Sequence, residues 1–112
     1  MYNNLRLIYI TTANKEEART IGRSIVESKL AACVNIVDSM ESIYRWEGEV
    51  KESKECLLIA KTHYSKVKQL TQLVVKLHSY DCPSVLSIAL TEHEGNPEYI
   101  NWILETTKGA TS

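Results

Sequence analysis

The chain has 112 residues, of which 44% are apolar and 24% are charged, and its formal net charge is −1. This composition is typical of a folded globular protein, and the length predicts one domain over residues 1–112 with a single core. The charges are balanced and form no block of one sign, which argues against a nucleic-acid partner. No apolar run reaches the length of a membrane span and no leader segment is recognised, so we expect no membrane association and a cytoplasmic location.

The first quarter of the chain predicts a strand followed by a helix. Residues 5–12 alternate in polarity and are rich in strand-forming side chains. Asn14 then suits a helix N-cap, with Glu17 three residues later as a variant of the capping box. Apolar residues recur at helical spacing after it, so we expect a helix from residue 15 to about residue 29.

The middle of the chain predicts two long strands joined by a tight turn. Strand-forming residues extend over 31–46 and 49–62. Glu47-Gly48 between them suits a two-residue hairpin turn, because glycine accepts a positive φ without steric cost. Apolar residues at helical spacing then predict a helix over 65–77.

The last third of the chain predicts a buried strand over 85–90 and a final helix that begins at Asn96-Pro97, since proline suits the first helical position. Residues 107–112 are small or polar, and we expect this tail to fray. The order β-α-β-β-α-β-α predicts the α+β class. It indicates a ferredoxin-like βαββαβ sandwich with an extra C-terminal helix and a long central β-hairpin.

The predicted hairpin favours self-association. Both of its strands far exceed the average strand of about 5–6 residues, so the tip should extend beyond the part of the sheet that two short helices can cover. That tip carries Tyr44 and Trp46, and a bare two-stranded ribbon with exposed aromatic residues would invite aggregation. Pairing with neighbouring copies in a closed ring would cover it. The alternative is a hairpin that bends back and packs Trp46 on its own domain.

Several segments, in order along the chain, resemble the CutA family of divalent-cation tolerance proteins. They are Leu30-Ala31-Ala32-Cys33-Val34-Asn35, Ser42-Ile43-Tyr44-Arg45-Trp46-Glu47-Gly48, Leu58-Ile59-Ala60-Lys61-Thr62, His78-Ser79-Tyr80-Asp81-Cys82-Pro83, and Gly95-Asn96-Pro97 with Tyr99 and Trp102. The resemblance covers the chain from the first strand to the last helix. It implies a ferredoxin-like subunit, similar in architecture to the PII signalling proteins, that assembles as a homotrimer through its long hairpins.

The resemblance also implies a role in tolerance of copper and other divalent ions, with Cu(II) or a related divalent cation as the bound ion. Some bacterial members are assigned a copper site from a cysteine that ends the first strand and a His-His pair before the last strand. Here those positions read Ile10 for the cysteine and Leu77 for the first histidine, so only His78 matches. Ser79 also replaces the proline that usually follows, so the whole site cannot be transferred to this chain.

Three side chains are candidate metal ligands in this sequence, namely His78, Cys82 and Cys33. His78 and Cys82 are four residues apart at the end of the second helix, and imidazole with thiolate suits copper or zinc, although tight binding needs three or four ligands. The alternatives are a His78 that stabilises the helix C-terminus, and cysteines that pack as small hydrophobic residues. With Cys56 the chain has three cysteines and no Cys-x-x-Cys, which predicts reduced, mostly buried thiols.

A second set of polar and aromatic residues near the family motifs suits a cleft between subunits. It consists of Arg45, Trp46, Glu47, Lys61, Tyr80, Asp81 and Trp102. The alternative is that these residues serve interface packing and salt bridges.

Three kinds of function remain open for the sequence. One is a trimeric protein that binds a divalent metal ion, the second is a PII-like sensor that holds a small molecule at the subunit interface, and the third is a trimeric scaffold. The tight turn at Glu47-Gly48 argues against the long mobile loop through which PII-type sensors usually work. We do not expect an enzyme, since no phosphate-binding loop, Ser-His-Asp set or metalloprotease helix is present.

Overall fold

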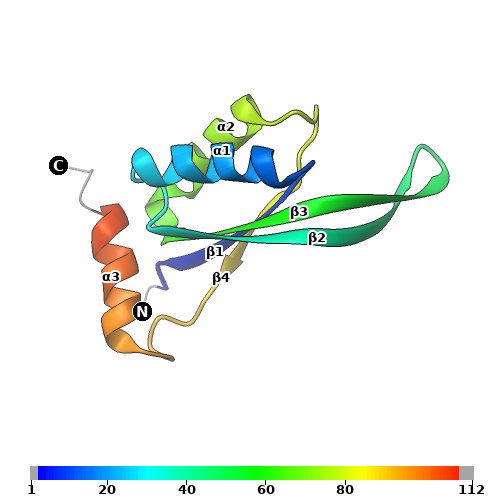
Figure 1. Ribbon diagram of the computed structural model, residues 1–112. Helices are drawn as coiled ribbons and strands as arrows, with labels where there is room; N and C mark the ends of the chain where they lie inside the picture. The colour runs from blue at the N-terminus through cyan, green and yellow to red at the C-terminus, as the bar shows by residue number, and fades with distance from the viewer. Residues whose placement is uncertain (1–2, 109–112) are drawn as a thin grey trace.

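The computed structural model describes residues 3–108, and its elements follow the predicted order. They are β1 (Leu5–Thr12), α1 (Lys15–Glu27), β2 (Cys33–Trp46), β3 (Glu49–His63), the 3₁₀ turn η1 (Tyr64–Lys66), α2 (Val67–Leu77), β4 (Val85–Ala89) and α3 (Pro97–Lys108). The strands form one antiparallel sheet in the order β2-β3-β1-β4. Helices α1 and α2 cover one face of it, and α3 lies at one end on the opposite side (Figure 1). The predicted ferredoxin-like fold with an extra helix is confirmed.

Helix α1 begins as predicted but ends earlier. The Asn14 side chain accepts a hydrogen bond from the backbone N–H of Glu17 at 2.8 Å, and the Glu17 carboxylate accepts one from the N–H of Ala13 at 2.9 Å, as in a capping box. The helix stops at Glu27 because Lys29 adopts a left-handed φ of 63°. The predicted end near residue 29 was therefore two residues too late.

The main core lies between the sheet and helices α1 and α2. Alternate residues of β1 and β3 point into it, and they meet the apolar stripes of the two helices. Its fully buried large side chains include Ile8, Ile10, Leu58, Ile21, Ile25, Leu70 and Val74. A second, smaller cluster forms where α3 packs on the other side, around Leu5, Ala32, Ile100 and Ile103.

Strand β2 is regular at both ends and bulged in the middle. It begins at Cys33 rather than at residue 31. Its pairing with β3 shifts between Val37 and Met40. Ser39 takes a left-handed φ of 63° there, and its N–H donates to the Asp38 carboxylate at 2.8 Å. A bulge of this kind bends the strand and increases its twist.

Beyond the bulge, β2 and β3 continue as a two-stranded ribbon that we call the arm, comprising residues 40–46 and 49–55. Strand β1 pairs with β3 only from Cys56 onward, so the arm strands pair with each other alone. Seven residues at about 3.3 Å each make the arm roughly 23 Å long, and Figure 1 shows it projecting from the body. Trp46 at its tip is 53% exposed, so the predicted overhang is confirmed and the alternative, in which the hairpin packs on its own domain, is wrong.

The strand predicted over 85–90 ends at Ala89, and the prediction that it is buried is wrong, because β4 is an edge strand whose residues after Val85 are exposed. The turn and the C-terminal helix also bear on the sequence predictions. Glu47 and Gly48 both have positive φ, 52° and 81°, as a two-residue type I′ turn requires. The prediction that the tail frays from residue 107 is wrong for its first two residues. Helix α3 continues to Lys108, and Thr107 is buried with its hydroxyl donating to the carbonyl of Ile103 at 2.8 Å. Residues 109–112 lie outside the described part of the chain.

Candidate functional site

His78 is the C-cap of α2, and its imidazole ring is fully enclosed. Its Nδ1 accepts a hydrogen bond from the backbone N–H of Tyr80 at 3.0 Å, and its Nε2 lies 2.7 Å from the carbonyl oxygen of Thr11. Because Nδ1 accepts, we assign the ring proton to Nε2, which donates to Thr11. In this arrangement neither ring nitrogen has a free lone pair for a metal ion.

The Glu17 carboxylate lies beside this ring and joins two parts of the chain. One oxygen caps α1 through Ala13, and the other accepts a hydrogen bond from the N–H of Ser79 at 2.8 Å. Its Oε1 is 3.7 Å from Nδ1 of His78. Partial burial alone would raise the pKa of Glu17, but the hydrogen bonds and the nearby imidazole outweigh it and lower the pKa below its usual value.

Tyr80 connects the same loop to the base of the arm. Its ring lies 4.7 Å from that of His78, and its hydroxyl donates to the carboxylate of Glu55 at 2.8 Å. Burial, together with the hydrogen bond and charge of Glu55, raises the pKa of the Tyr80 phenol to about 12. Asp81 and Cys82 follow on the exposed side of the loop. The cluster therefore fixes the loop after α2 against both β1 and β3.

The three candidate metal ligands are not brought together within one subunit. Cys33 pairs with Lys61, which lies opposite Leu7 of β1, whereas His78 bonds to Thr11. Four residues along β1 separate these two positions by about 13 Å. Across residues 3–108, no group of three or more His, Cys, Asp or Glu side chains could hold an ion. A single subunit therefore does not fit the ligand number that copper or zinc requires.

The cysteines also differ in exposure from what the sequence predicts. Only Cys56 is buried, and burial, with the Asp38 charge nearby, raises the pKa of its thiol. Cys33 is half-buried on the edge strand, and Cys82 is exposed. The prediction of mostly buried thiols is therefore wrong, because the edge of a sheet and a loop leave two of the three sulfur atoms accessible.

The seven residues expected at a subunit cleft fall into three separate places. Arg45, Trp46 and Glu47 are at the tip of the arm, where the Arg45 guanidinium reaches the carbonyl of Gly48 at 3.5 Å. Tyr80 and Asp81 belong to the loop after α2, at the base of the arm. The third place holds Lys61 on β3 and Trp102 on α3.

Lys61 and Trp102 flank Tyr99, which the sequence analysis placed only in a family motif. The Lys61 ammonium donates to the Tyr99 hydroxyl at 3.1 Å and lies 5.2 Å from the centre of its ring. The Trp102 ring packs on Tyr99 with centroids 5.5 Å apart. Lys61 and Tyr99 are 38 positions apart in sequence, so only the packing of α3 against β3 reveals the contact.

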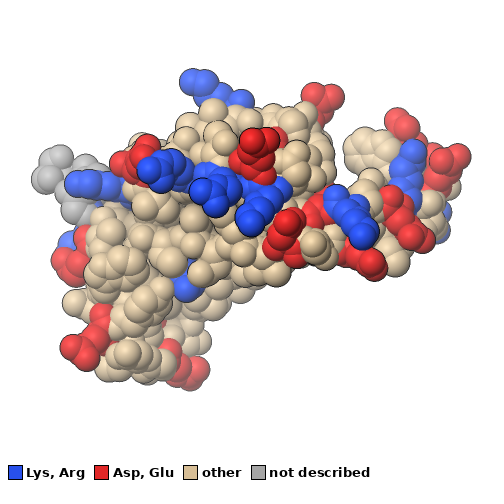
Figure 2. Space-filling view, viewed as in Figure 1, with Lys and Arg blue, Asp and Glu red and all other residues tan. Residues whose placement is uncertain are grey.

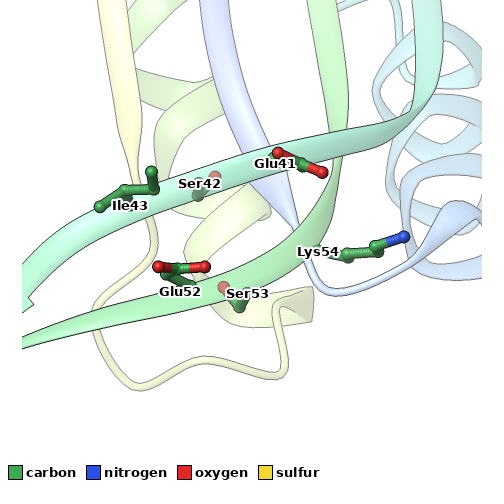
Figure 3. Close-up of a pocket in the computed structure, with 6 residues that line it drawn as sticks. All are labelled: Glu41, Ser42, Ile43, Glu52, Ser53 and Lys54. Atoms are coloured by element: carbon green, nitrogen blue, oxygen red, sulfur yellow. The ribbon is translucent and has the colours of Figure 1, made fainter.

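The arm carries a shallow hollow of its own, of about 200 Å³, between its two strands. Figure 3 shows the cross-strand partners that line it, which are Glu41 with Lys54, Ser42 with Ser53, and Ile43 with Glu52. On the face of the arm that Figure 2 shows, acidic and basic side chains intermingle. Ile43 is 70% exposed. An apolar side chain left bare on a two-stranded ribbon marks the arm as a contact surface.

Comparison with known proteins gives a family. The model of the family described as CutA1 divalent ion tolerance protein matches residues 6–106. The chain belongs to the CutA1 family. It is 45% identical, over 90% of this chain and 96% of the relative, to the divalent-cation tolerance protein CutA of Thermus thermophilus.

Solved structures agree with this assignment to the CutA1 family. The chain is similar to a divalent cation tolerance protein from Thermus thermophilus, with a TM-score of 0.87, 44% identity, and 92% and 98% of the two chains covered. It is also similar to CutA1 of Oryza sativa, with a TM-score of 0.89, 40% identity and 95% of each chain covered.

CutA1 relatives differ in length and in named location. The chain covers only 55% of the Arabidopsis thaliana protein CutA, described as chloroplastic, at 42% identity. A structure from Archaeoglobus fulgidus, with a TM-score of 0.86 and 37% identity over 92% of this chain and 98% of that one, is described as periplasmic. In the part of this chain that the structure describes, no helix has the length and apolarity to cross a membrane.

Proposed function

We propose that this protein acts in divalent-cation tolerance as a homotrimer that binds copper(II) or a related ion where its subunits meet. The family supports the general role. The observation that carries the proposed assembly is the arm, because its two strands have no third strand beside them and its tip exposes Tyr44 and Trp46.

A second surface supports the same assembly. The sheet face turned away from α1 and α2, which we call the open face, carries alternating apolar residues across three strands. Tyr9 pairs with Ile59 on one side and with Leu86 on the other. Leu86 and Ile88 of the edge strand β4 are 59% and 45% exposed. Helix α3 covers only the end of this face near Leu5, so the rest would gain from contact with another copy.

The resemblance to the CutA family is our reason for proposing three copies, and a ring would give the arm a place to pair. An arm that joins the edge of the next sheet makes a heterologous contact, which closes only in a ring. Each subunit then both gives and receives an arm, and the open faces turn toward the ring axis.

Light scattering during size-exclusion chromatography tests the proposed assembly. We expect three times the chain mass of 12.7 kDa at micromolar concentration. Leu86→Lys places a charge on the open face and should reduce the assembly, whereas Val75→Lys, on the exposed surface of α2, should not. A monomer in the unmodified protein would contradict the proposal, as would equal effects of the two lysines.

For the metal ion, we propose that ligands from adjacent subunits complete the site. Cys33 and Cys82 are the less buried cysteines, and thiolate suits copper(I) or zinc, or copper(II) where imidazole joins it. His78 would have to give up one of its two backbone hydrogen bonds to join them. In a calorimetric titration, the affinity for copper should therefore be lower in Cys33→Ser and Cys82→Ser than in the parent protein, and unchanged in Cys56→Ser. Unchanged affinity in both of the first two variants would remove the thiols from the site.

The other candidate functions receive less support from the geometry. A PII-like sensor needs a long mobile loop between the central strands, and here the connection is the two-residue turn Glu47-Gly48. A scaffold role would show as a trimer with no metal affinity in the same titration. We propose a non-enzymatic role and a cytoplasmic location, where the three free thiols would remain reduced.

A further inference from the structure

A hollow of about 450 Å³ lies between α3 and the end of the open face, away from the His78 cluster. This volume falls within the range of about 300–1,000 Å³ that is typical of small-molecule sites. Its walls are mainly apolar and come from Leu5, Leu90, Ile100 and Ile103.

The hollow contains one cationic side chain, that of half-buried Lys61. Among the residues that the structure describes, no carboxylate approaches its ammonium within 4.0 Å. An ammonium without a counter-ion at the edge of an apolar hollow attracts an anion more strongly than it would in open water.

Tyr99 gives this charge a fixed position and adds a second donor. Lysine can only donate, so at 3.1 Å the Tyr99 hydroxyl oxygen is the acceptor of the Lys61 proton. The hydroxyl proton of Tyr99 then remains available for another partner. One ammonium and one hydroxyl, 3.1 Å apart at the edge of an apolar hollow, match the two oxygens of a single carboxylate.

The rest of the lining restricts the ligand further. Among the described residues that line the hollow, Glu94 alone is acidic. Its charge opposes that of any anion, so a dicarboxylate or a nucleotide is disfavoured more than a monocarboxylate. The apolar walls favour a hydrocarbon body over a sugar or a phosphate.

We propose that this hollow binds a small monocarboxylate with an apolar body, whose carboxylate accepts hydrogen bonds from Lys61 and Tyr99. One subunit supplies every group that would contact the ligand, so the site needs no ligand from a neighbouring copy.

Calorimetric titration of the full chain with 3-phenylpropionate, and with the neutral 3-phenylpropionamide of nearly the same shape, tests this site. We expect the acid to bind roughly tenfold or more tightly than the amide, since hydrogen bonds to charged groups are worth about that factor or more. Lys61→Met should abolish the preference while keeping the apolar stem. Tyr99→Phe should reduce the preference for the acid over the amide severalfold. Lys76→Met, on the exposed surface of α2, serves as the matched control and should leave it unchanged.

Three outcomes would overturn the proposal. They are equal affinity for acid and amide, a preference that survives in folded Lys61→Met, and no binding of either compound at millimolar concentration. Phenylmalonate, which adds a second carboxylate, should bind more weakly than 3-phenylpropionate, and tighter binding would contradict the role given to Glu94. The carboxylate and amide titrations are run without copper, so their outcomes are read separately from those of the metal titration.

Discussion

Replacing His78 by alanine should destabilise the fold, because the ring bonds two backbone groups that have few other partners. The substitution removes the acceptor of the Tyr80 N–H and the donor to the Thr11 carbonyl. Each buried polar group left without a partner costs about 1–3 kcal/mol. Tyr80 is partly exposed and water can reach it, so we expect a total loss of about 2–4 kcal/mol, a large share of the ~5–15 kcal/mol that stabilises a typical domain.

The variant His78→Asn serves as a graded control for this prediction. The asparagine Oδ1 stands close to the position of Nδ1 and can still accept from the N–H of Tyr80, whereas its side chain is too short to reach Thr11. We therefore expect about half of the loss seen in His78→Ala, roughly 1–2 kcal/mol.

Urea unfolding followed by circular dichroism measures both variants. All samples need the same protein concentration, because association of subunits adds to the apparent stability. A free energy of unfolding for His78→Ala within 0.5 kcal/mol of the parent would refute the structural role, since surface changes are about that small. If His78→Asn unfolds normally yet loses all copper affinity, the ring is a metal ligand instead.

Three further predictions concern single positions. Because the pKa of Glu17 is lowered in the folded state, its carboxylate stabilises the fold at pH values above the ordinary glutamate pKa of about 4.3. This contribution disappears as the pH falls through the folded-state pKa. Glu17→Gln should therefore flatten the acid limb of a stability–pH curve measured by thermal unfolding. Gly22→Ala places a methyl group 3.1 Å from Val34 and 3.2 Å from Leu58. The cost of overpacking, about 1–3 kcal/mol, should exceed the gain in helix propensity of about 0.5–1 kcal/mol, so the variant should be less stable. An increase in melting temperature would contradict this packing. In Gly48→Ala the added methyl group has no neighbour within 4 Å, but the alanine must keep a φ of +81°. Urea unfolding should therefore show a loss of about 1–2 kcal/mol in the free energy of unfolding. No loss would mean that the turn has changed type.

The order of the elements and most of their boundaries were readable from local patterns. The N-cap at Asn14, the turn at Glu47-Gly48 and the helix start at Pro97 each depend on hydrogen bonds or backbone angles within a few residues. Strand length alone also predicted the arm, because strands over 31–46 and 49–62 extend beyond the part of the sheet that two short helices can cover. The errors in element boundaries fell at helix and strand ends, where a left-handed Lys29 or the packing of Thr107 decided the boundary.

The candidate sites depended on contacts between distant parts of the chain. Histidine and cysteine spacing predicted a possible ion site, but the structure shows the His78 ring bonded to a strand carbonyl 67 residues away. Glu17 had a visible capping role, and nothing in its own segment indicated that its second oxygen holds Ser79, 62 positions later. The pairing of Lys61 with Tyr99 likewise exists only because α3 packs across β3.

The range of the forces involved explains why the elements could be predicted from the sequence and the contacts at the candidate sites could not. Capping, turn geometry and apolar periodicity act within one or two helical turns, so the residues themselves specify the strands, the helices and the overhanging hairpin. Which polar atoms meet is decided by sheet order, strand register and the face on which each helix packs, and these emerge only when the whole core closes. For this protein that closure places His78 inside the fold and leaves Lys61 without a counter-ion within the described chain.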